Sequence, residues 1–349
     1  MQNKLQQYFP QIKTRIQLTD EIDSRKNLKT IFESWDEKQQ NYFLDICCGA
    51  RGVKMLYDSF FKEILNPDAV PERLEELLSL LLEQKVKILK VLPNDSTRIA
   101  DESSLLIMDI VVELEDHSIA DVECQKIGYA FPGQRAACYS ADLLLRQYKR
   151  VKGEKGKAFS YKDIKKVYSI IFYEKSPTEF RKFPEYKLHR STQQTDTGLN
   201  IDLLQEFLFI PLDIALKIYH NKGVKTKLDA WILFLSSDNP EDIVMLIETY
   251  PEFRPLYNDL YDLCLNIERV MNMFSKELSQ LDKNTVQFMI DQMQDELDAQ
   301  KAKLDAQKAQ LSEKDSRIVE QEAKLDAQKA QLLEKDAIIA ALQKQVQKD

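Results

Sequence analysis

The feature that most constrains the fold is a pair of neighbouring extended segments in which carboxylates interrupt apolar runs. Residues 105–112 are apolar except for Asp109. In residues 120–125, polar side chains alternate with small or apolar ones, and these polar residues are Asp121, Glu123 and Gln125. The period of two along a strand places all three on one face. Because a buried, unpaired carboxylate is costly, Asp109 needs a partner or a metal ion.

The length of the turn between the two segments decides whether their carboxylates meet. With residues 115–117 as a three-residue loop, an antiparallel hairpin places Asp109 directly across from Glu123, with their Cβ atoms about 5 Å apart. A two-residue turn at 116–117 would instead set Asp109 beside Cys124, on the opposite face from Glu123. Only the first register brings two carboxylates together to hold a divalent ion. Taken alone, the pattern is more often a half-buried strand pair with a solvated acidic face.

The segments around this pair alternate between helical and extended patterns, which predicts a mixed α/β domain. Helical periodicity marks residues 55–65, 73–84 and 134–149. Apolar segments predict strands at 86–92, 105–114, 118–125 and 167–173. Residues 207–211 and 228–235 fit either short strands or turns of buried helix, while 240–245 and 255–274 fit helices.

The C-terminal part is predicted to be one long helical region. The last proline is Pro255 and the last glycine is Gly223, so residues 256–349 lack the two strongest helix breakers. Apolar residues recur there every seven positions, at Leu297, Leu304, Leu311, Ile318, Leu325, Leu332, Ile339 and Val346. This spacing is typical of a coiled coil, but the intervening positions that should also be apolar are mostly polar. A weak self-associating coiled coil and a solitary solvated helix both remain open.

The charge of the chain limits how it could contact nucleic acid. A net charge of −8 argues against broad attraction to phosphates, so any such contact must be local. Residues 146–166 hold nine basic and two acidic residues. The candidates for DNA contact in this patch are Arg146, Lys149, Arg150 and Lys152. Gly153 and Gly156 predict a mobile loop there, although a basic solvated loop without a partner is equally common.

Several other classes of protein are excluded by the composition. The five cysteines are scattered, which predicts reduced thiols rather than disulfides or a zinc site. The three histidines are isolated, and no Gly-rich phosphate-binding loop is present. No apolar run is long enough for a signal peptide or a membrane span, so we expect no membrane contact and a cytoplasmic location.

Five short motifs, in order, resemble those of the PD-(D/E)XK nuclease family transposases, also described as recombination-promoting nucleases. Residues 58–64 resemble the Asp-x-x-Phe-Lys helix of that family, and Asp109 with Glu123-Cys124-Gln125 resembles its Asp and Glu-x-Gln pair. The similarity continues through Arg135, Tyr139, Gly153-Glu154, Tyr161 and the strand at 167–171. It covers residues 56–173, about a third of the chain.

The resemblance implies a restriction-endonuclease-like core, a mixed sheet flanked by helices, with Mg²⁺ or alternatively Mn²⁺ as cofactor. Asp109 and Glu123 would be metal ligands, and Asp58 a further carboxylate near the metal. Gln125 replaces the usual motif lysine, and its neutral amide can orient water or phosphate but cannot act as a base. Lys126 should point to the other face. Arg135 would be either a phosphate contact or a partner of the carboxylates.

The function implied by this resemblance is that of a Mg²⁺-dependent DNA endonuclease linked to recombination or transposition. The alternative is a nuclease-fold protein with little or no activity that serves as a coiled-coil assembly or binding module. We predict an N-terminal segment (1–50), a nuclease-like domain (51–255), a helical connector (256–296) and a heptad-repeat helix (297–349). The last of these could form a homo-oligomer.

Overall fold

The structure is a computed structural model that describes residues 3–93, 109–126, 132–191, 193–279 and scattered positions from 293 onward. The chain divides into two compact units, Met1–Phe288 and Met289–Asp349. Part of the strand predicted at 105–114 lies outside the described residues, which resume at Asp109. None of the described helices is long and apolar enough to cross a membrane.

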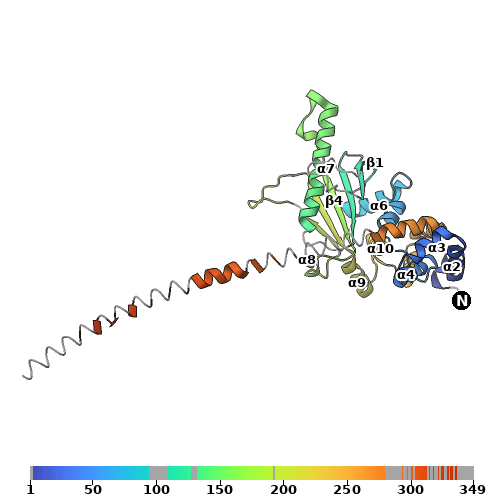
Figure 1. Ribbon diagram of the computed structural model, residues 1–349. Helices are drawn as coiled ribbons and strands as arrows, with labels where there is room; N and C mark the ends of the chain where they lie inside the picture. The colour runs from blue at the N-terminus through green and yellow to red at the C-terminus, as the bar shows by residue number, and fades with distance from the viewer. Residues whose placement is uncertain are drawn as a thin grey trace, which may run out of the picture. The chain divides into compact units, whose positions relative to one another are not determined.

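The described residues of the first unit build a six-stranded mixed sheet in the order β1-β2-β3-β4-β6-β5 (Figure 1). The strands are β1 (Ile88–Val91), β2 (Ile110–Leu114), β3 (Ile119–Gln125), β4 (Val167–Tyr173), β5 (His189–Ser191) and β6 (Gln205–Pro211). The central strands β3, β4 and β6 are parallel, and the outer pairs are antiparallel. Together with its flanking helices, this sheet confirms the predicted α/β class.

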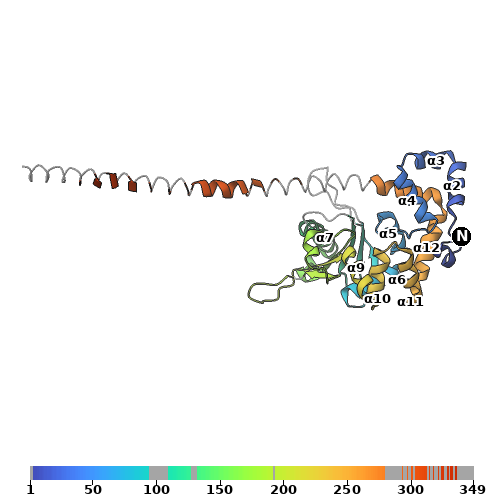
Figure 2. The same cartoon turned by 90° about the horizontal axis from the view of Figure 1, so that it is seen from below.

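One long helix covers one face of the sheet. Helix α7 (Pro132–Lys155) connects β3 to β4, because two parallel neighbours need a crossover connection. Its Tyr139 and Leu143 pack against Val111, Ile119 and Val167. Figure 2 shows α7 on the side of the sheet opposite to α9 and α10.

The remaining helices surround the main core on the other face. They are α1 (Lys4–Tyr8), α2 (Arg15–Ser24), α3 (Lys26–Glu33), α4 (Glu37–Cys47), α5 (Asp58–Ile64), α6 (Pro71–Leu82), α9 (Leu212–Lys222), α10 (Lys227–Ser236), α11 (Pro240–Thr249) and α12 (Arg254–Leu265). The short α8 (Thr178–Arg181) and the 3₁₀ turns η1 (Gly156–Ala158), η2 (Tyr161–Asp163) and η3 (Pro251–Phe253) complete the elements. Sheet residues such as Val112, Ala120 and Ile170 belong to this core.

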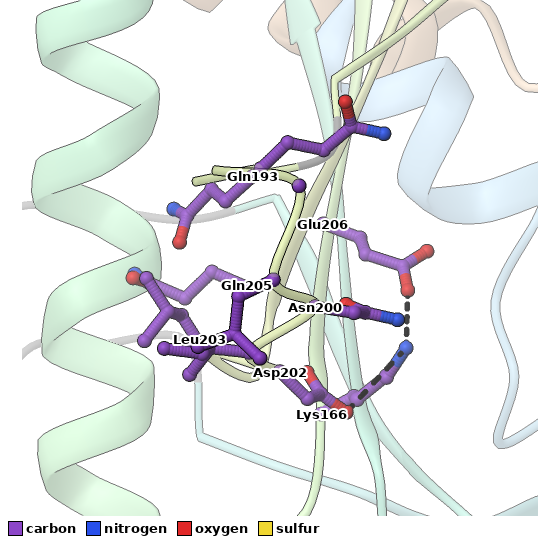
Figure 3. A pocket seen from close by; sticks show the side chains of 11 residues that line it. Lys166, Gln193, Asn200, Asp202, Leu203, Gln205 and Glu206 are labelled. Atoms are coloured by element: carbon purple, nitrogen blue, oxygen red, sulfur yellow. Dashed lines mark hydrogen bonds and ion pairs between the residues drawn. The ribbon is translucent and has the colours of Figure 1, made fainter. Parts of the chain in front are cut away.

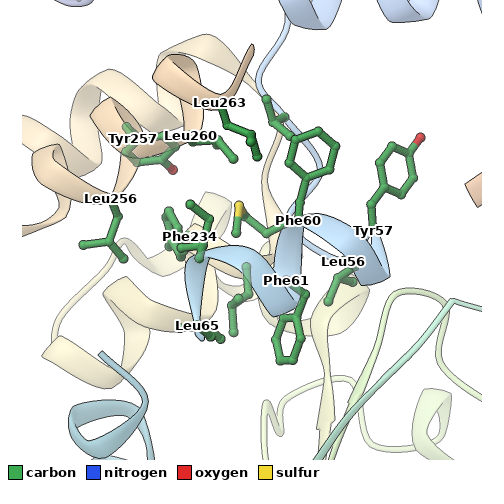
Figure 4. Close-up of a cluster of buried hydrophobic side chains, with 14 of the residues drawn as sticks. Leu56, Tyr57, Phe60, Phe61, Leu65, Phe234, Leu256, Tyr257, Leu260 and Leu263 are labelled. Atoms are coloured by element: carbon green, nitrogen blue, oxygen red, sulfur yellow. The ribbon is translucent and has the colours of Figure 1, made fainter. Parts of the chain in front are cut away.

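Helix α5 is embedded in this core, which fixes its position relative to the sheet. Phe60 and Phe61 are fully buried, and Figure 4 shows them among side chains of α10 and α12, including Phe234 and Leu260. The ring of Phe61 also lies 6.4 Å, centroid to centroid, from that of Phe172 in β4. A seven-residue helix has little stability alone, so this packing must hold it.

The structure decides two open alternatives and interrupts one expected helix. Residues 228–235 form helix α10 and not a strand, whereas 207–211 form β6. The helical region expected from residue 256 is interrupted at Asn266, whose φ of −88° and ψ of 83° leave the helix. The Asn266 side chain accepts the backbone N–H of Arg269 at 3.1 Å and so caps a new helix over residues 267–279.

The second unit is described only in part. Residues 303–312 are helical, and every described residue from 293 onward is exposed. The exposed residues include Leu297, Leu304 and Leu311 of the heptad pattern. A coiled coil stays a prediction.

Candidate active site

The hairpin of β2 and β3 adopts the register that brings the two predicted carboxylates to the same level. Ile110 pairs with Val122 and Val111 with Asp121, so position 109 lies across from position 123. The loop is residues 115–117, closed by Leu114 N–H donating to the Ser118 carbonyl at 2.9 Å. His117 takes the left-handed conformation, with a φ of 65°, that ends three-residue hairpin loops. The structure therefore confirms the three-residue turn.

Asp109 is held between the end of β3 and helix α5. Its Oδ2 accepts the backbone N–H of Cys124 at 2.7 Å, and its Oδ1 lies 3.3 Å from Lys62 Nζ. Its side chain is 18% exposed. The carboxylate thus joins two elements and remains within reach of solvent.

Behind Asp109, the polar residues of β3 are buried on the face covered by α7. Asp121 is 1%, Glu123 4% and Gln125 5% exposed. Burial raises the pKa of Asp121 well above its usual value, and the nearby Asp109 raises it further, against Arg146. Burial also raises the pKa of Glu123 well above its usual value, with added repulsion from Asp121 and Asp109. These carboxyl groups therefore favour their protonated forms.

Arg135 is close enough to Glu123 for its positive charge to affect that carboxyl group. It lowers the pKa of Glu123 against the larger effect of burial, as does the Gln125 amide. Its guanidinium carbon lies 4.8 Å from the centre of the Tyr139 ring, one turn along α7. Burial raises the pKa of Tyr139, so its hydroxyl stays neutral. The structure brings Arg135, Glu123 and Gln125 together with Asp109.

The four basic candidates farther along α7 fall into two groups. Arg146 Nε lies 3.0 Å from Asp142 Oδ2, and Arg150 Nη1 lies 3.0 Å from Glu113 Oε2. Lys149 and Lys152 are exposed. Helix α7 continues to residue 155 and includes Gly153, so the loop expected there begins later. The two arginines are engaged with buried carboxylates, and the two lysines face solvent.

Asp58 and Lys126 are the remaining residues that the sequence singled out. Asp58 begins α5, but its side chain lies outside what the structure describes. Lys126 points to the face opposite Gln125, as expected, where its Nζ pairs with Glu277 and lies 4.6 Å from the Tyr57 ring centre. The Lys126 side chain is only 9% exposed, so it is not a surface charge.

The residues present fit a divalent cation in their chemistry. Asp109, Glu123 and Asp121 offer hard oxygen donors, which Mg²⁺ and Mn²⁺ prefer. One buried oxygen of Asp121 and one of Glu123 have no hydrogen-bond partner within the described part of the chain. Among the described residues, no three His, Cys, Asp or Glu side chains are already arranged as a metal-binding group. The donor chemistry of these carboxylates therefore fits such an ion.

A polar hollow lies at the end of the parallel strands opposite to Glu123 and Gln125 (Figure 3). It includes residues just before β4 and at the start of β6. There the Lys166 ammonium pairs with Glu206 and lies 3.8 Å from Asp202. Its charges are thus matched locally, and it lacks the unpaired buried carboxyl oxygens seen at Asp121 and Glu123.

Sequence reasoning did not predict the position of Lys62. The Lys62 side chain is 30% exposed and lies against Asp109. The available signal was its spacing four residues after Asp58, which places both on one helical face.

A mixed sheet that carries Asp109 opposite Glu123, with Gln125 two residues on, fits the PD-(D/E)XK class of nuclease folds. Residues 55–292 match the PD-(D/E)XK nuclease family transposase, which is more than half of the chain. The chain therefore belongs to that family. Searches of curated proteins and of solved structures gave no significant match.

Proposed function

We propose that this protein is a metal-dependent DNA endonuclease whose cleavage serves transposition or recombination. The observation that carries the proposal is the β2–β3 hairpin, which sets Asp109 opposite Glu123 on a face that also buries Asp121 and Gln125. Burying several carboxyls costs stability unless a cation compensates them. Membership of a nuclease family supports hydrolysis of a phosphodiester bond.

Asp109 and Glu123 are the proposed ligands of Mg²⁺, with Mn²⁺ as a substitute and Asp58 as a further ligand from α5. When bound, the ion would lower the pKa of a water molecule and offset charge on the phosphate. Asp109 is oriented for this role by the Cys124 N–H. Glu123 must lose its proton, and the positive charge of Arg135 favours that loss.

Gln125 and Lys62 would share the task of the missing motif lysine. The Gln125 amide can orient a water molecule or a phosphate oxygen but carries no charge. The ammonium of Lys62 lies 3.3 Å from the Asp109 carboxylate. We propose that Lys62 supplies the positive charge that stabilises the phosphate during cleavage.

DNA would approach along α7. Lys149 and Lys152 are exposed, so they can contact phosphates directly. Arg146 and Arg150 pair with Asp142 and Glu113, and we assign them the supporting role of fixing α7 on the sheet. Arg135 lies near the N-terminus of α7, close to Glu123, where the scissile phosphate would bind.

The test is cleavage of a supercoiled plasmid with Mg²⁺ or Mn²⁺ by the wild type and by Asp109→Asn and Glu123→Gln. We expect cleavage by the wild type and a loss of at least about 100-fold in each variant, the range for removal of a key electrostatic group. Glu113→Gln is the matched control, because Glu113, like Glu123, is a buried carboxylate of the β2–β3 hairpin but pairs with Lys90 and Arg150. It should cut like the wild type.

Failure of this experiment has a specific meaning. A folded wild type that is inert with both metals would favour the assembly or binding module with a heptad tail. Equal activity of all variants would place the cleavage site elsewhere in the chain.

A further inference from the structure

The far end of α7 carries three aromatic rings among lysines, in a place that the proposed cleavage site does not use. The ring centroids of Tyr148 and Phe159 are 5.5 Å apart, and those of Phe159 and Tyr161 are 5.4 Å apart. The rings of Tyr148 and Tyr161 are stacked, 6.1 Å apart and 12° from parallel. We call these three residues the aromatic cluster. In Figure 1 this end of α7 extends past the sheet.

The aromatic cluster is not part of a hydrophobic core. Other residues of α7, such as Tyr139 and Leu143, pack on the sheet, but none of the three rings belongs to a core cluster. Tyr161 is 75% exposed. Because Tyr148 covers one face of its ring, the opposite face is the one open to solvent.

The turn that carries Tyr161 is held in place by hydrogen bonds. Asp163 Oδ2 accepts the backbone N–H of Ser160 at 2.8 Å, and its Oδ1 accepts from Lys155 Nζ at 2.6 Å. Gly156, with a φ of 52°, lets the chain turn after α7. The turn that carries the Tyr161 ring is therefore fixed at the end of α7.

The surroundings of the aromatic cluster are positive in an otherwise acidic chain. Residues 148–163 contain six basic and two acidic residues, whereas the whole chain has a net charge of −8. Lys152 Nζ donates to the Tyr148 hydroxyl at 2.7 Å, and Lys157 and Lys162 are exposed nearby in the sequence. A polyanion is the ligand that such a surface complements.

We propose that the aromatic cluster is a stacking platform for unpaired bases, and that the lysines around it contact the adjoining phosphates. The proposal rests on DNA being the substrate, as proposed above, and it specifies the substrate as DNA with a single-stranded segment. Aromatic rings stack on any base, so this contact is tolerant of sequence. Within a paired duplex the base faces are covered by their neighbours, so Tyr161 favours single strands, flaps and open ends.

The helix sets the spacing between this platform and the cleavage site. Tyr148 follows Arg135 by 13 residues on α7. At 1.5 Å per residue this is about 20 Å along the helix axis. That length corresponds to about six nucleotides at duplex spacing. The unpaired segment would therefore begin about six nucleotides from the cut.

The test measures binding of a fluorescent 20-nucleotide oligo(dT) and of a matched duplex by anisotropy, with EDTA present. We expect the wild type to prefer the single strand, and Tyr161→Ala to weaken that binding about 10-fold, within the range for base–aromatic stacking. Tyr161→Phe should bind like the wild type and Tyr161→Leu should not, because only the former keeps a π face. Duplex binding should be unchanged. Ile16→Ala, at a 74% exposed residue of α2, is the control.

A Tyr161→Trp variant reports stacking directly. Trp35 and Trp231 are buried, so quenching of fluorescence by oligo(dT) would come from the introduced indole. Equal single-strand binding by the Ala, Leu and wild-type proteins, or no quenching, would overturn the platform. The platform would also be overturned if the Tyr161 variants differed from the wild type only in sedimentation mass, because the cluster would then be a self-association surface. If the wild type cleaves plasmid in these cases, the nuclease proposal survives. If the wild type binds neither DNA form, both proposals fail.

Discussion

At the scale of single residues, the candidate site is governed by carboxyl groups that the fold removes from water. Asp121 is enclosed between β3 and α7, and its pKa is raised first by burial and then by Asp109. Burial also raises the pKa of Glu123, and the charges of Asp121 and Asp109 raise it further. In the absence of metal, ionising either group is therefore less favourable in the folded protein than in the unfolded chain, where water solvates the carboxylate.

The first prediction is a pH dependence of stability. A raised folded-state pKa gives stability that is fully present below the unfolded value, about 3.9 for Asp, and is lost as the pH rises through the folded value. In EDTA, the free energy of unfolding should therefore fall as the pH rises above 4. Asp121→Asn should make the free energy of unfolding depend less on pH. At pH 8 the free energy of unfolding of this variant should be higher than that of the wild type by roughly 1–3 kcal/mol. Urea unfolding at both pH values measures it, and identical slopes for the two proteins would contradict it.

The second prediction concerns Lys62. Lys62→Met removes the ammonium beside Asp109, so cleavage should fall about 100-fold while the fold is kept. Lys227→Met is the matched control, since Lys227 has similar exposure and pairs with Glu76 and Glu252. The measurement is the rate of plasmid cleavage by the wild type and both variants, with circular dichroism to check folding. Equal rates for both variants would show that Lys62 has only a structural role.

The residue-level outcome shows what local patterns can and cannot predict. The facing of Asp109 and Glu123 followed from the period of a strand and the length of one loop, both local properties. Lys126 was correctly expected to face away from Gln125. Its partner Glu277 lies 151 positions later in the chain and was not foreseen, because no local pattern encodes a contact over that distance.

At the scale of elements, that buried ion pair ties the helix over residues 267–279 to the end of β3. Glu277 is 1% and Lys126 is 9% exposed. Lys126 directly follows Gln125, so the pair connects the candidate site to the helix that precedes the second unit in sequence. Removing one partner would leave the other charge buried and uncompensated.

The third prediction follows from this pair. Lys126→Met should lower the free energy of unfolding by about 3–5 kcal/mol, because the Glu277 carboxylate stays buried alone. The double variant Lys126→Met with Glu277→Met should recover most of that loss. Urea unfolding of the single and double variants gives the coupling. Additive losses in the double variant would refute a direct interaction.

The elements that the sequence left undecided or placed wrongly have physical reasons. Residues 228–235 are apolar except for Asp229, so the sequence left a buried strand and a buried helix both open, and only packing decides between them. The break at Asn266 contains neither glycine nor proline, yet its side chain caps the next helix. Gly153 was interpreted as the start of a loop, but a single glycine is tolerated inside a helix as long as α7.

At the scale of the whole molecule, the second unit has no core of its own among its described residues. The heptad leucines from Leu297 to Leu332 that are described are 50–65% exposed. Apolar stripes of this kind on a helix are buried when copies associate. The polar positions between them predict that such an association would be weak.

The fourth prediction is that removing residues 297–349 abolishes self-association without unfolding the first unit. The apparent mass of the full chain should increase with concentration in sedimentation experiments, and that of the shortened chain should not. The thermal midpoint should change by less than about 2 °C, since the described tail residues are exposed. A concentration-independent monomer in both cases would identify the tail as a solitary solvated helix.

The central claim is that Asp109 and Glu123 bind the ion that cleavage requires, and metal binding can be measured without any substrate. Calorimetric titration with Mn²⁺ should show a site in the wild type that weakens at least 10-fold in Asp109→Asn and in Glu123→Gln. Glu113→Gln should bind like the wild type. Binding that is equal in all four proteins, or absent from the folded wild type, would contradict the account.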